Sequence, residues 1–388
     1  MKVAIIGAGP AGLAASISAI GDVVVFEKNS DAGKKLLLTG SGRCNIKNEC
    51  NKLSKYHSSN PELIEHIINK SNLQKLDLFF DKIGLVLKNK NGYYYPFSEK
   101  SSSVLSCLKT SSKASFRYNT KIDKIIKEDD KFIINDEVFD KVIITTGGLS
   151  YPKTGSCKDG FLLAKLLGHT IVDLNPSLVA LNTNTGLEKK WAGIRCEVDV
   201  LSFIDNTFVK KEHGEIQLTK NGLSGICIFN LSRDISISLK EGKSCWIVIN
   251  FTPFEKEALL KILSNNKSIS NSLDGFLDYK LTNILLDYLS INKDTKYFQL
   301  SKKDQIKLIN TLTNFKVNIS STSDFLDAQV TSGGVSLKEI NLNTMESKLV
   351  KGLYFAGEIL DLDGDCGGYN LTLSFLTGII AGGNDDKN

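Results

Sequence analysis

A glycine motif between an apolar run and a helical pattern constrains this chain more than any other feature. The motif GAGPAG occupies residues 7–12, after the run KVAII at 2–6 and before a helical pattern that stops near Gly21. Short apolar runs of this kind are typical of buried strands, and Pro10 is suited to the first turn of a helix. A second apolar run, DVVVF, follows at 22–26. The order strand, helix, strand predicts a βαβ unit and hence a parallel sheet covered by helices.

The motif matches G-x-G-x-x-G, which binds the pyrophosphate of a dinucleotide in this context. Gly7 permits the tight turn, Gly9 lets the phosphates approach the backbone, and Gly12 lets the helix pack on the strand. The helix N-terminus offers free N–H groups to an anion. Glu27 ends the second strand, where a carboxylate accepts hydrogen bonds from the ribose hydroxyls. This acid argues against a 2′-phosphate but does not separate NAD from FAD.

The pattern of the chain changes at about residue 176 and returns at 331. Alternating residues at 116–136 predict an antiparallel meander, and KVIITTGG at 141–148 predicts another buried strand. Residues 178–252 look like short strands separated by turns, and 254–315 have helical periodicity. We therefore expect a discontinuous α/β domain of residues 1–175 and 331–388. Its insertion consists of a β domain at 176–252 and 316–330 and a helical subdomain at 253–315.

The composition is that of a soluble globular protein. The chain has 388 residues, of which 41% are hydrophobic and 23% charged, and a net charge of +5. This excess is too weak to indicate nucleic-acid or membrane binding by itself. Eight cysteines occur without a CxxC pair or zinc spacing. With neither a secretion signal nor a convincing apolar span of membrane length, we expect a cytoplasmic protein with reduced thiols.

An acidic, glycine-rich loop at 353–370, LYFAGEILDLDGDCGGYN, raises the question of a metal site. Counting from Asp361, the spacing of Asp363 and Asp365 fits a calcium loop. The sixth position is Cys366 rather than glycine, however, and the twelfth is Thr372 rather than glutamate. We therefore expect no calcium and no other metal here.

Four stretches resemble the family of FAD flavoproteins that includes aminoacetone oxidases and BaiN-like bile-acid reductases. They are GAGPAGLAA, GKKLLLTGSGRCNIKN at 33–48, TTGGLSYPKTGSCKDGFLLAKLLGH at 145–169, and the region 331–382 with GEILDLDGDCGGYN. The segment 214–233 resembles the inserted domain of that family. The resemblance runs nearly end to end. It implies a discontinuous Rossmann-type FAD-binding domain with an inserted β-barrel-like domain and a small helical part.

The resemblance also implies where FAD binds. Glu358 is expected on the ribityl chain, Ile122 at the adenine, and the helix after Gly368 with its N–H groups at the flavin N1–C2=O edge, where they stabilise the reduced anion. The expected cofactor-binding residues are Gly7, Gly9, Pro10, Ala11, Gly12, Glu27, Lys28, Lys35, Gly42, Arg43, Cys44, Asn45, Ile122, Thr146, Gly147, Gly148, Gly357, Glu358, Gly368, Tyr369, Asn370 and Leu371.

Several of these residues have an alternative interpretation. Cys44 is favoured as a small packing residue over a redox thiol, because no other cysteine has a redox-pair spacing. Asp361 and Asp363 either line the flavin pocket or cap turns, and for Asp363 and Asp365 a solvated turn position competes equally. His169 is expected at a helix C-terminus, and Arg195 is favoured as a surface strand residue over a substrate contact. The sequence suggests no partner for the other histidines, His57, His66 and His213.

The predicted function is that of an FAD-dependent oxidoreductase in which flavin N5 transfers a hydride. The resemblance implies either NAD(P)H-dependent reduction of an activated double bond in a small molecule or oxidation of a small amine by oxygen. The sequence has one G-x-G-x-x-G, so NAD(P)H is expected as a transient donor. A flavin-dependent RNA-modifying or RNA-binding protein and a redox sensor are the alternatives from other classes. The sequence identifies neither a catalytic acid or base nor an oligomeric state.

Overall fold

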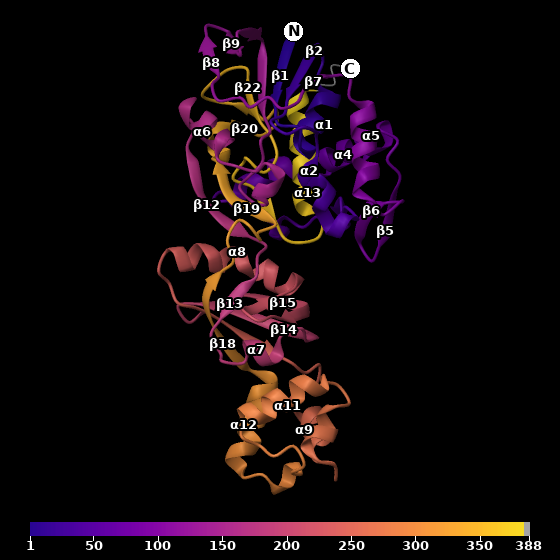
Figure 1. The fold of residues 1–388 in the computed structure, drawn as a ribbon, viewed down its shortest axis with the longest axis vertical. Coiled ribbons are helices and arrows are strands. Elements are labelled where there is room, and N and C mark those ends of the chain that lie inside the picture. Colours follow the sequence, from indigo (N-terminus) through magenta and orange to yellow (C-terminus); the bar gives the residue numbers. More distant parts are fainter. Residues whose placement is uncertain (384–388) are drawn as a thin grey trace. The chain divides into compact units, whose positions relative to one another are not determined.

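The computed structural model describes residues 1–383, which form two compact units. One unit contains Met1–Asn175 together with the segment from Gln329 onward, and the other contains Pro176–Ala328 (Figure 1). Each unit is described by itself below.

A seven-stranded sheet forms the centre of the first unit. The strand order is β20 (Ile340–Asn341), β21 (Glu346–Ser347), β22 (Leu353–Phe355), β11 (Lys141–Ile144), β1 (Lys2–Ile6), β2 (Asp22–Phe26) and β7 (Ser115–Arg117). The five strands from β22 to β7 are parallel. All four residues of β11 are buried, which explains its continuous apolar sequence. The predicted discontinuous Rossmann-type fold is confirmed.

Helices α1 (Pro10–Ser18) and α13 (Tyr369–Gly382) pack against each other through small residues. A Cβ atom at Gly378 would lie 2.3 Å from the carbonyl oxygen of Ala11, so only glycine allows this approach. The first and last parts of the chain thereby form one domain. The other helices of this unit are α2 (Lys34–Leu38), α3 (Ile64–Ile67), α4 (Lys70–Lys82), α5 (Ser101–Ser111) and α6 (Asp159–Leu166).

The expected meander at 116–136 is partly wrong. Residues 115–117 are strand β7, which pairs with β2 in the parallel sheet. The antiparallel meander consists instead of β8 (Ile126–Glu128), β9 (Lys131–Ile134) and β10 (Glu137–Phe139). The error arises because both segments are short and alternating, and only the pairing partner distinguishes them. The remaining small sheets are β3 (Lys47–Asn48) with β6 (Tyr93–Pro96) and β5 (Leu87–Lys90), β4 (Tyr56–His57) with β23 (Asp363–Gly364), and β12 (Ile171–Ser177) with β19 (Val330–Val335).

The second unit contains a closed six-stranded barrel. Its order is β13 (Leu181–Thr183), β16 (Gly222–Ser224), β15 (Thr207–Leu218), β14 (Arg195–Ile204), β17 (Cys245–Asn250) and β18 (Phe315–Thr322). The barrel confirms the predicted β-barrel-like insertion. Its residues share a hydrophobic core with the helices α7 (Glu188–Trp191), α9 (Lys256–Leu263), α10 (Ile269–Leu273), α11 (Tyr279–Tyr288) and α12 (Lys302–Thr313).

Two helices in this unit were not predicted, the short α7 and a longer one. Residues 226–240, expected to be strands and turns, form α8 (Ile226–Lys240). The sequence ISISL within it alternates with period two, as a strand does. Ile228, Leu231 and Ile235 are nevertheless buried together at helical spacing, so tertiary packing overrides the local alternation.

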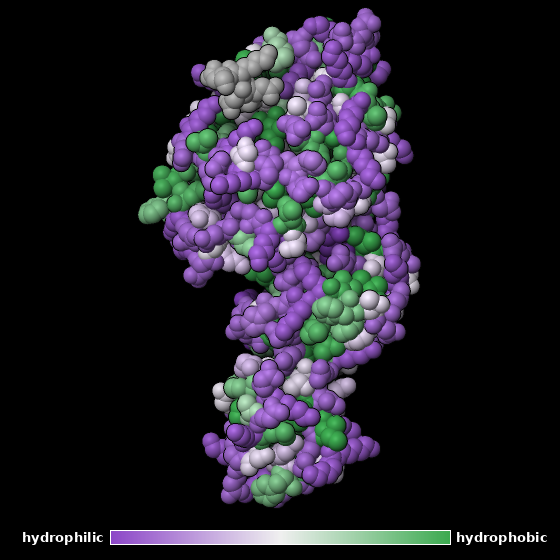
Figure 2. All heavy atoms as spheres, turned by 180° about the vertical axis from the view of Figure 1, so that it is seen from behind, coloured by the Kyte–Doolittle hydropathy of each residue, from purple (hydrophilic) through white to green (hydrophobic). Residues whose placement is uncertain are grey.

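The face of the molecule drawn in Figure 2 is mainly hydrophilic. Figure 2 shows one face on which hydrophobic side chains form separate small patches. Among residues 1–383, no helix has both the length and the apolar character needed to cross a membrane.

Candidate functional site

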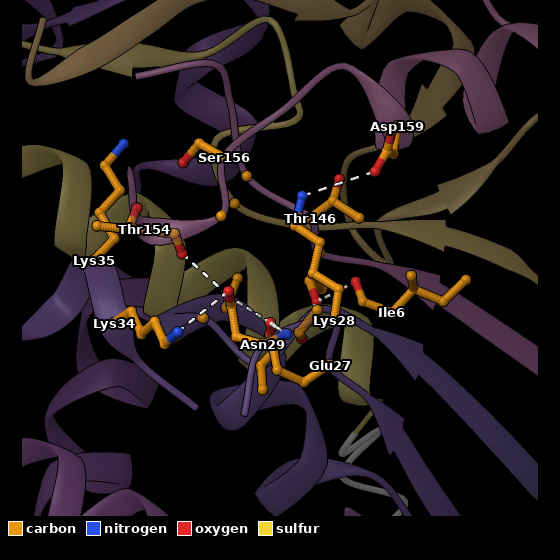
Figure 3. Close-up of a pocket in the computed structure, with 18 of the residues that line it drawn as sticks. Ile6, Glu27, Lys28, Asn29, Lys34, Lys35, Thr146, Thr154, Ser156 and Asp159 are labelled. Carbon is orange, nitrogen blue, oxygen red and sulfur yellow. Dashed lines mark hydrogen bonds and ion pairs between the residues drawn. The ribbon is translucent and has the colours of Figure 1, made fainter. Parts of the chain in front are cut away.

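The main pocket of the first unit lies at the carboxyl edge of the parallel sheet, where ligands bind in open α/β sheets (Figure 3). Gly7 follows β1, Glu27 follows β2, Thr145 follows β11, and Gly357 comes two residues after β22. The predicted cofactor residues that line the pocket are Gly7, Gly9, Pro10, Ala11, Glu27, Lys28, Lys35, Ile122, Thr146, Gly147, Gly357 and Glu358. The topology thus brings together residues from both ends of the chain.

The three motif glycines occupy three different environments. Gly7 has φ +104°, and a Cβ there would lie 2.7 Å from the carbonyl oxygen of Thr145. A Cβ at Gly12 would lie 1.9 Å from the carbonyl oxygen of Gly7, so Gly12 is required for helix packing and does not line the pocket. A Cβ at Gly9 would meet nothing within 4 Å. Position 9 therefore leaves open pocket space beside the N-terminus of α1, where a pyrophosphate approaches in this motif.

The Glu27 carboxylate is buried and holds the turn after β1 in place. One oxygen accepts from Ala8 N, and the other accepts from Asn29 N and Asn29 Nδ2, each at 2.8 Å. In Figure 3, dashed lines join Asn29 to Glu27, Lys34 and Thr154. The acid is thus fixed at the point where the motif expects a ribose ligand.

A second carboxylate, Glu358, lies at the other side of the sheet centre. Its oxygens accept from Lys35 Nζ at 2.7 Å, from Ser150 Oγ at 2.8 Å and from Thr331 N at 2.9 Å. A Cβ at Gly148 would lie 2.6 Å from a Glu358 oxygen, so Gly148 makes room for the carboxylate without lining the pocket. The cluster gives Lys35 and Glu358 a fixed geometry within the pocket that also contains the turn after β1.

The predicted residues at 42–45 lie outside the main pocket. Arg43 is exposed, and its guanidinium contacts no acceptor among residues 1–383. Cys44 is fully buried, and burial raises the pKa of its thiol to about 11 despite a hydrogen bond with Thr39. When the Asn45 side-chain amide is oriented so that both its oxygen and its nitrogen have suitable partners, the nitrogen donates to the carbonyls of Lys47 and Tyr94 at 3.2 Å. A neutral, enclosed thiol supports the packing interpretation of Cys44.

The residues at 368–371 also lie outside the main pocket and begin α13 as predicted. Gly368, with φ +96°, is the residue before the helix, and a Cβ there would lie within 2.9 Å of the Lys47 backbone. Asn370 uses its side chain to accept from Gly364 N at 2.9 Å and to donate to Gly364 O at 2.7 Å. The buried ring of Tyr369 packs edge-on against Tyr56 at 5.3 Å, and Leu371 is also buried. This segment is therefore anchored to β23, β3 and β4.

The acidic loop is a strand ladder. β23 pairs with β4 in antiparallel register, and Asp365 accepts from His57 Nε2 at 2.8 Å and from Lys55 Nζ at 3.0 Å. Asp361 accepts from Ser58 Oγ at 3.1 Å and from Ser59 N at 3.0 Å. The calcium-like spacing arises because alternate residues of a strand face the same way. The solvated-turn alternative is wrong for Asp363 and Asp365, which are 1% and 2% exposed.

Further pocket residues were not predicted. They come from the segments that follow β2, β7 and β11, including the first residues of α2 and α6, and comprise Asn29, Lys34, Thr120, Lys121, Thr154, Ser156, Cys157 and Asp159. Lys28 Nζ donates to Cys157 Sγ at 2.7 Å and lies 3.7 Å from an Asp159 oxygen. No residue type marks these positions in the sequence. Only the expected topology could have indicated these residues, because the segments that follow parallel strands meet at one edge of the sheet.

The remaining histidines and Arg195 are accounted for by other contacts. His169 Nε2 lies 2.8 Å from Ser347 Oγ, and burial lowers the pKa of its ring. His213 lies between Asp199 and Glu197 on the barrel, and hydrogen bonds to both raise its pKa. Arg195 is exposed on β14 with Glu215 at 3.4 Å. His66 is exposed on α3.

The residues of the first unit fit an FAD molecule. The open space at Gly9 suits a pyrophosphate, and Glu27 suits a ribose. Two buried oxygens, Thr146 Oγ1 and Asp361 Oδ1, have no hydrogen-bond partner within residues 1–383. Since buried polar atoms are normally satisfied, Thr146 Oγ1, whose residue lines the pocket, suits a polar group of a bound molecule, whereas Asp361 does not line the pocket. Among the described residues, no cluster of His, Cys, Asp or Glu could hold a metal ion.

Comparison with known proteins identifies relatives along the whole chain. A family model described as the HI0933-like protein Rossmann domain matches residues 1–384. The 3-dehydro-bile acid delta(4,6)-reductase of Clostridium scindens is 32% identical over 400 residues, which cover 98% of each protein. The ribosomal RNA dihydrouridine synthase of Escherichia coli is 31% identical over 94% of this chain and 93% of that protein.

Solved structures resemble the fold more distantly. A flavocytochrome c3 fumarate reductase in an open conformation has a TM-score of 0.47 at 17% identity, covering 98% of this chain and 77% of that one. A 3-ketosteroid-delta4-(5alpha)-dehydrogenase from Rhodococcus jostii has a TM-score of 0.46 at 11% identity, covering 98% of this chain and 96% of that one.

Proposed function

We propose, from the premise that this chain belongs to the HI0933-like Rossmann-domain family of FAD-dependent oxidoreductases, that it reduces a carbon–carbon double bond conjugated to a carbonyl. NAD(P)H is the electron donor in this proposal. The proposal is supported by the combination of two observations in one chain: the pocket that contains Glu27, and similarity along the whole chain to a delta(4,6)-reductase. FAD, when bound, supplies hydride transfer at N5.

The protein's own residues hold and orient FAD in this proposal. Gly7, Gly9 and the start of α1 bind the pyrophosphate, and Glu27 binds the ribose. Lys35 and Glu358 lie beside the ribityl chain, with Lys35 orienting the acid. The start of α13, anchored by Asn370, meets the flavin ring and favours its reduced anion.

The names of the relatives support one type of chemistry. A 3-dehydro-bile acid with delta(4,6) double bonds is a conjugated ketone, and dihydrouridine is uridine saturated at the 5,6 bond, which is conjugated to a carbonyl. A small conjugated ketone is the proposed substrate class. Uridine in RNA is the second candidate, because two relatives carry the dihydrouridine synthase name. The inserted segment 176–328 has 19 basic and 17 acidic residues, and this small excess does not by itself indicate RNA binding.

An anaerobic two-step experiment tests the proposal. The purified protein, reconstituted with FAD, is first mixed with NADH or NADPH, and we expect bleaching of the flavin absorbance. The reduced enzyme is then mixed with a 3-oxo-4,6-diene bile acid or with a uridine oligonucleotide, and we expect the first to restore the absorbance. Restoration only by the oligonucleotide would establish the RNA candidate. If neither nicotinamide bleaches the flavin while a small amine does, the reductase proposal is wrong and an amine oxidase replaces it.

A further inference from the structure

We propose that His57, oriented by Asp365, is the proton donor of the reduction. This inference rests on the proposed function, because it assumes that the start of α13 meets the flavin ring. It adds the acid that the sequence did not identify. His57 lies on β4, which pairs with β23, and β23 is hydrogen-bonded to the start of α13.

The imidazole is held by a buried carboxylate and remains accessible. His57 Nε2 lies 2.8 Å from Asp365 Oδ1, and the His57 side chain is 23% exposed while that of Asp365 is 2% exposed. The other Asp365 oxygen accepts from Lys55 Nζ at 3.0 Å. A carboxylate bound to one ring nitrogen fixes the orientation of the ring. The second ring nitrogen of His57 has no hydrogen bond among residues 1–383 and is available to a substrate.

The charged groups around the imidazole form one ladder. Asp363 lies opposite His57 in the β4–β23 register, Asp365 lies diagonally, and Lys55 pairs with Asp365. The phenols of Tyr56 and Tyr369 lie on the neighbouring elements, and burial raises the pKa of both, so they remain neutral. His57 is therefore the residue of this ladder to which we assign the proton transfer.

The ladder is attached directly to the start of α13. Asn370 makes two hydrogen bonds with Gly364 of β23, and a Cβ at Gly364 would lie 2.7 Å from Tyr369 Cβ. Tyr56, next to His57, packs against the Tyr369 ring. Whatever binds at the first turn of α13 thus lies near the β4–β23 ladder, and short backbone connections fix the position of His57 relative to that turn.

The proposed step conserves atoms and electrons. Reduction of a double bond conjugated to a carbonyl adds a hydride to the β carbon and a proton to the α carbon. The reduced flavin supplies the hydride with its two electrons, and His57 supplies the proton from the free ring nitrogen. The neutral imidazole then regains a proton from water. Asp365 is a positioning residue, because it acts on the substrate only through His57.

The test separates the hydride donor from the proton donor. We compare wild type with His57→Gln, Asp365→Asn and the control His66→Gln, which changes an exposed histidine of the same unit. For each protein we measure the FAD dissociation constant of the apoprotein and the rate of flavin bleaching by the better nicotinamide donor. We then measure reoxidation of the reduced enzyme by the 3-oxo-4,6-diene bile acid as a function of pH.

We expect reoxidation to slow about 10²- to 10⁴-fold in His57→Gln, which is the usual effect of losing a general acid. FAD affinity and bleaching should stay within about threefold of wild type in all variants. The pH dependence of the wild-type reoxidation rate should be lost in His57→Gln and altered in Asp365→Asn.

Three results would overturn the proposal. Equal reoxidation by wild type and His57→Gln would remove His57 from the step. If His57→Gln no longer binds FAD, the isosteric variant Asp365→Asn provides the test. An Asp365→Asn protein with full flavin content and the pH profile of wild type would show that Asp365 does not act through His57. If the wild type bleaches with nicotinamide but neither the bile acid nor the uridine oligonucleotide reoxidises it, the proposed function fails and the proton donor with it.

Discussion

Replacing Glu27 by alanine should weaken FAD binding about a hundredfold, and the structure explains how this magnitude arises. The two carboxylate oxygens offer about four lone-pair sites. Ala8 N, Asn29 N and Asn29 Nδ2 occupy three of them at 2.8 Å each. Two ribose hydroxyls therefore need the one open site and the site that the Asn29 side chain now uses.

The net energy follows from this count. A hydrogen bond to a charged group contributes about 1.5–3 kcal/mol, so loss of two bonds costs about 3 kcal/mol at the lower limit. Since about 1.4 kcal/mol corresponds to a tenfold change in affinity, the dissociation constant rises about a hundredfold. Asn29→Ala should not weaken FAD binding in the same way, because it removes a competing donor from the carboxylate. We expect its affinity to remain within about threefold of wild type or to increase.

Fluorescence titration of apoprotein with FAD measures both effects. Asp22→Ala is the matched control, since Asp22 is an exposed carboxylate at the opposite end of the same strand. Amide hydrogen exchange at Ala8 and Asn29 should accelerate in Glu27→Ala, because both backbone donors lose their acceptor. Equal FAD affinities for Glu27→Ala and wild type would refute the assignment of Glu27 to the ribose. An equal loss in Asn29→Ala and Glu27→Ala would instead refute the count of competing donors.

Three further predictions concern the glycine motif, the buried thiol and the electron donor. Gly9→Ala should leave the melting temperature of the apoprotein within about 2 °C and weaken FAD binding at least about tenfold, because the added Cβ would enter open pocket space. Gly12→Ala should instead lower the melting temperature, because its Cβ would clash with the carbonyl oxygen of Gly7. Equal effects of the two variants on melting temperature and FAD affinity would contradict the assigned roles. Cys44→Ser should retain flavin and most of the rate of flavin reduction in stopped-flow measurements, since burial keeps the thiol neutral. A variant with full flavin content that is no longer reduced would reveal a catalytic thiol. NAD(P)H and the conjugated ketone should show ping-pong kinetics with mutual competition, because the sequence has one dinucleotide motif, and steady-state patterns of a ternary complex would indicate a separate nicotinamide site.

Local sequence determined the parts of the site that lie within a few residues of one another. Gly7 and Gly12 are fixed by the tight turn and the close helix contact, which leave no room for a side chain, whereas Gly9 faces open pocket space. The position of Glu27 followed from the length of one βαβ unit. The start of α13 at Tyr369 was expected from the family resemblance, and the structure begins the helix there.

Long-range pairing determined what the sequence left open. The alternating segment at 115–117 joined the parallel sheet, and the alternating ISISL segment became part of α8, because burial against distant residues outweighs local periodicity. Neither segment contains the distant residues against which it packs.

The acidic loop shows the same division most clearly. The sequence alone showed carboxylates at alternate positions and excluded calcium, since the sixth and twelfth positions lack the required residues. It could not show that Asp365 meets His57 and Lys55, which lie about 300 residues earlier in the chain. That contact exists because β23 pairs with β4 and because a strand directs every second side chain to one face. The chemistry of each residue is thus written in the sequence, whereas the tertiary fold alone brings an acid and an imidazole within hydrogen-bonding distance.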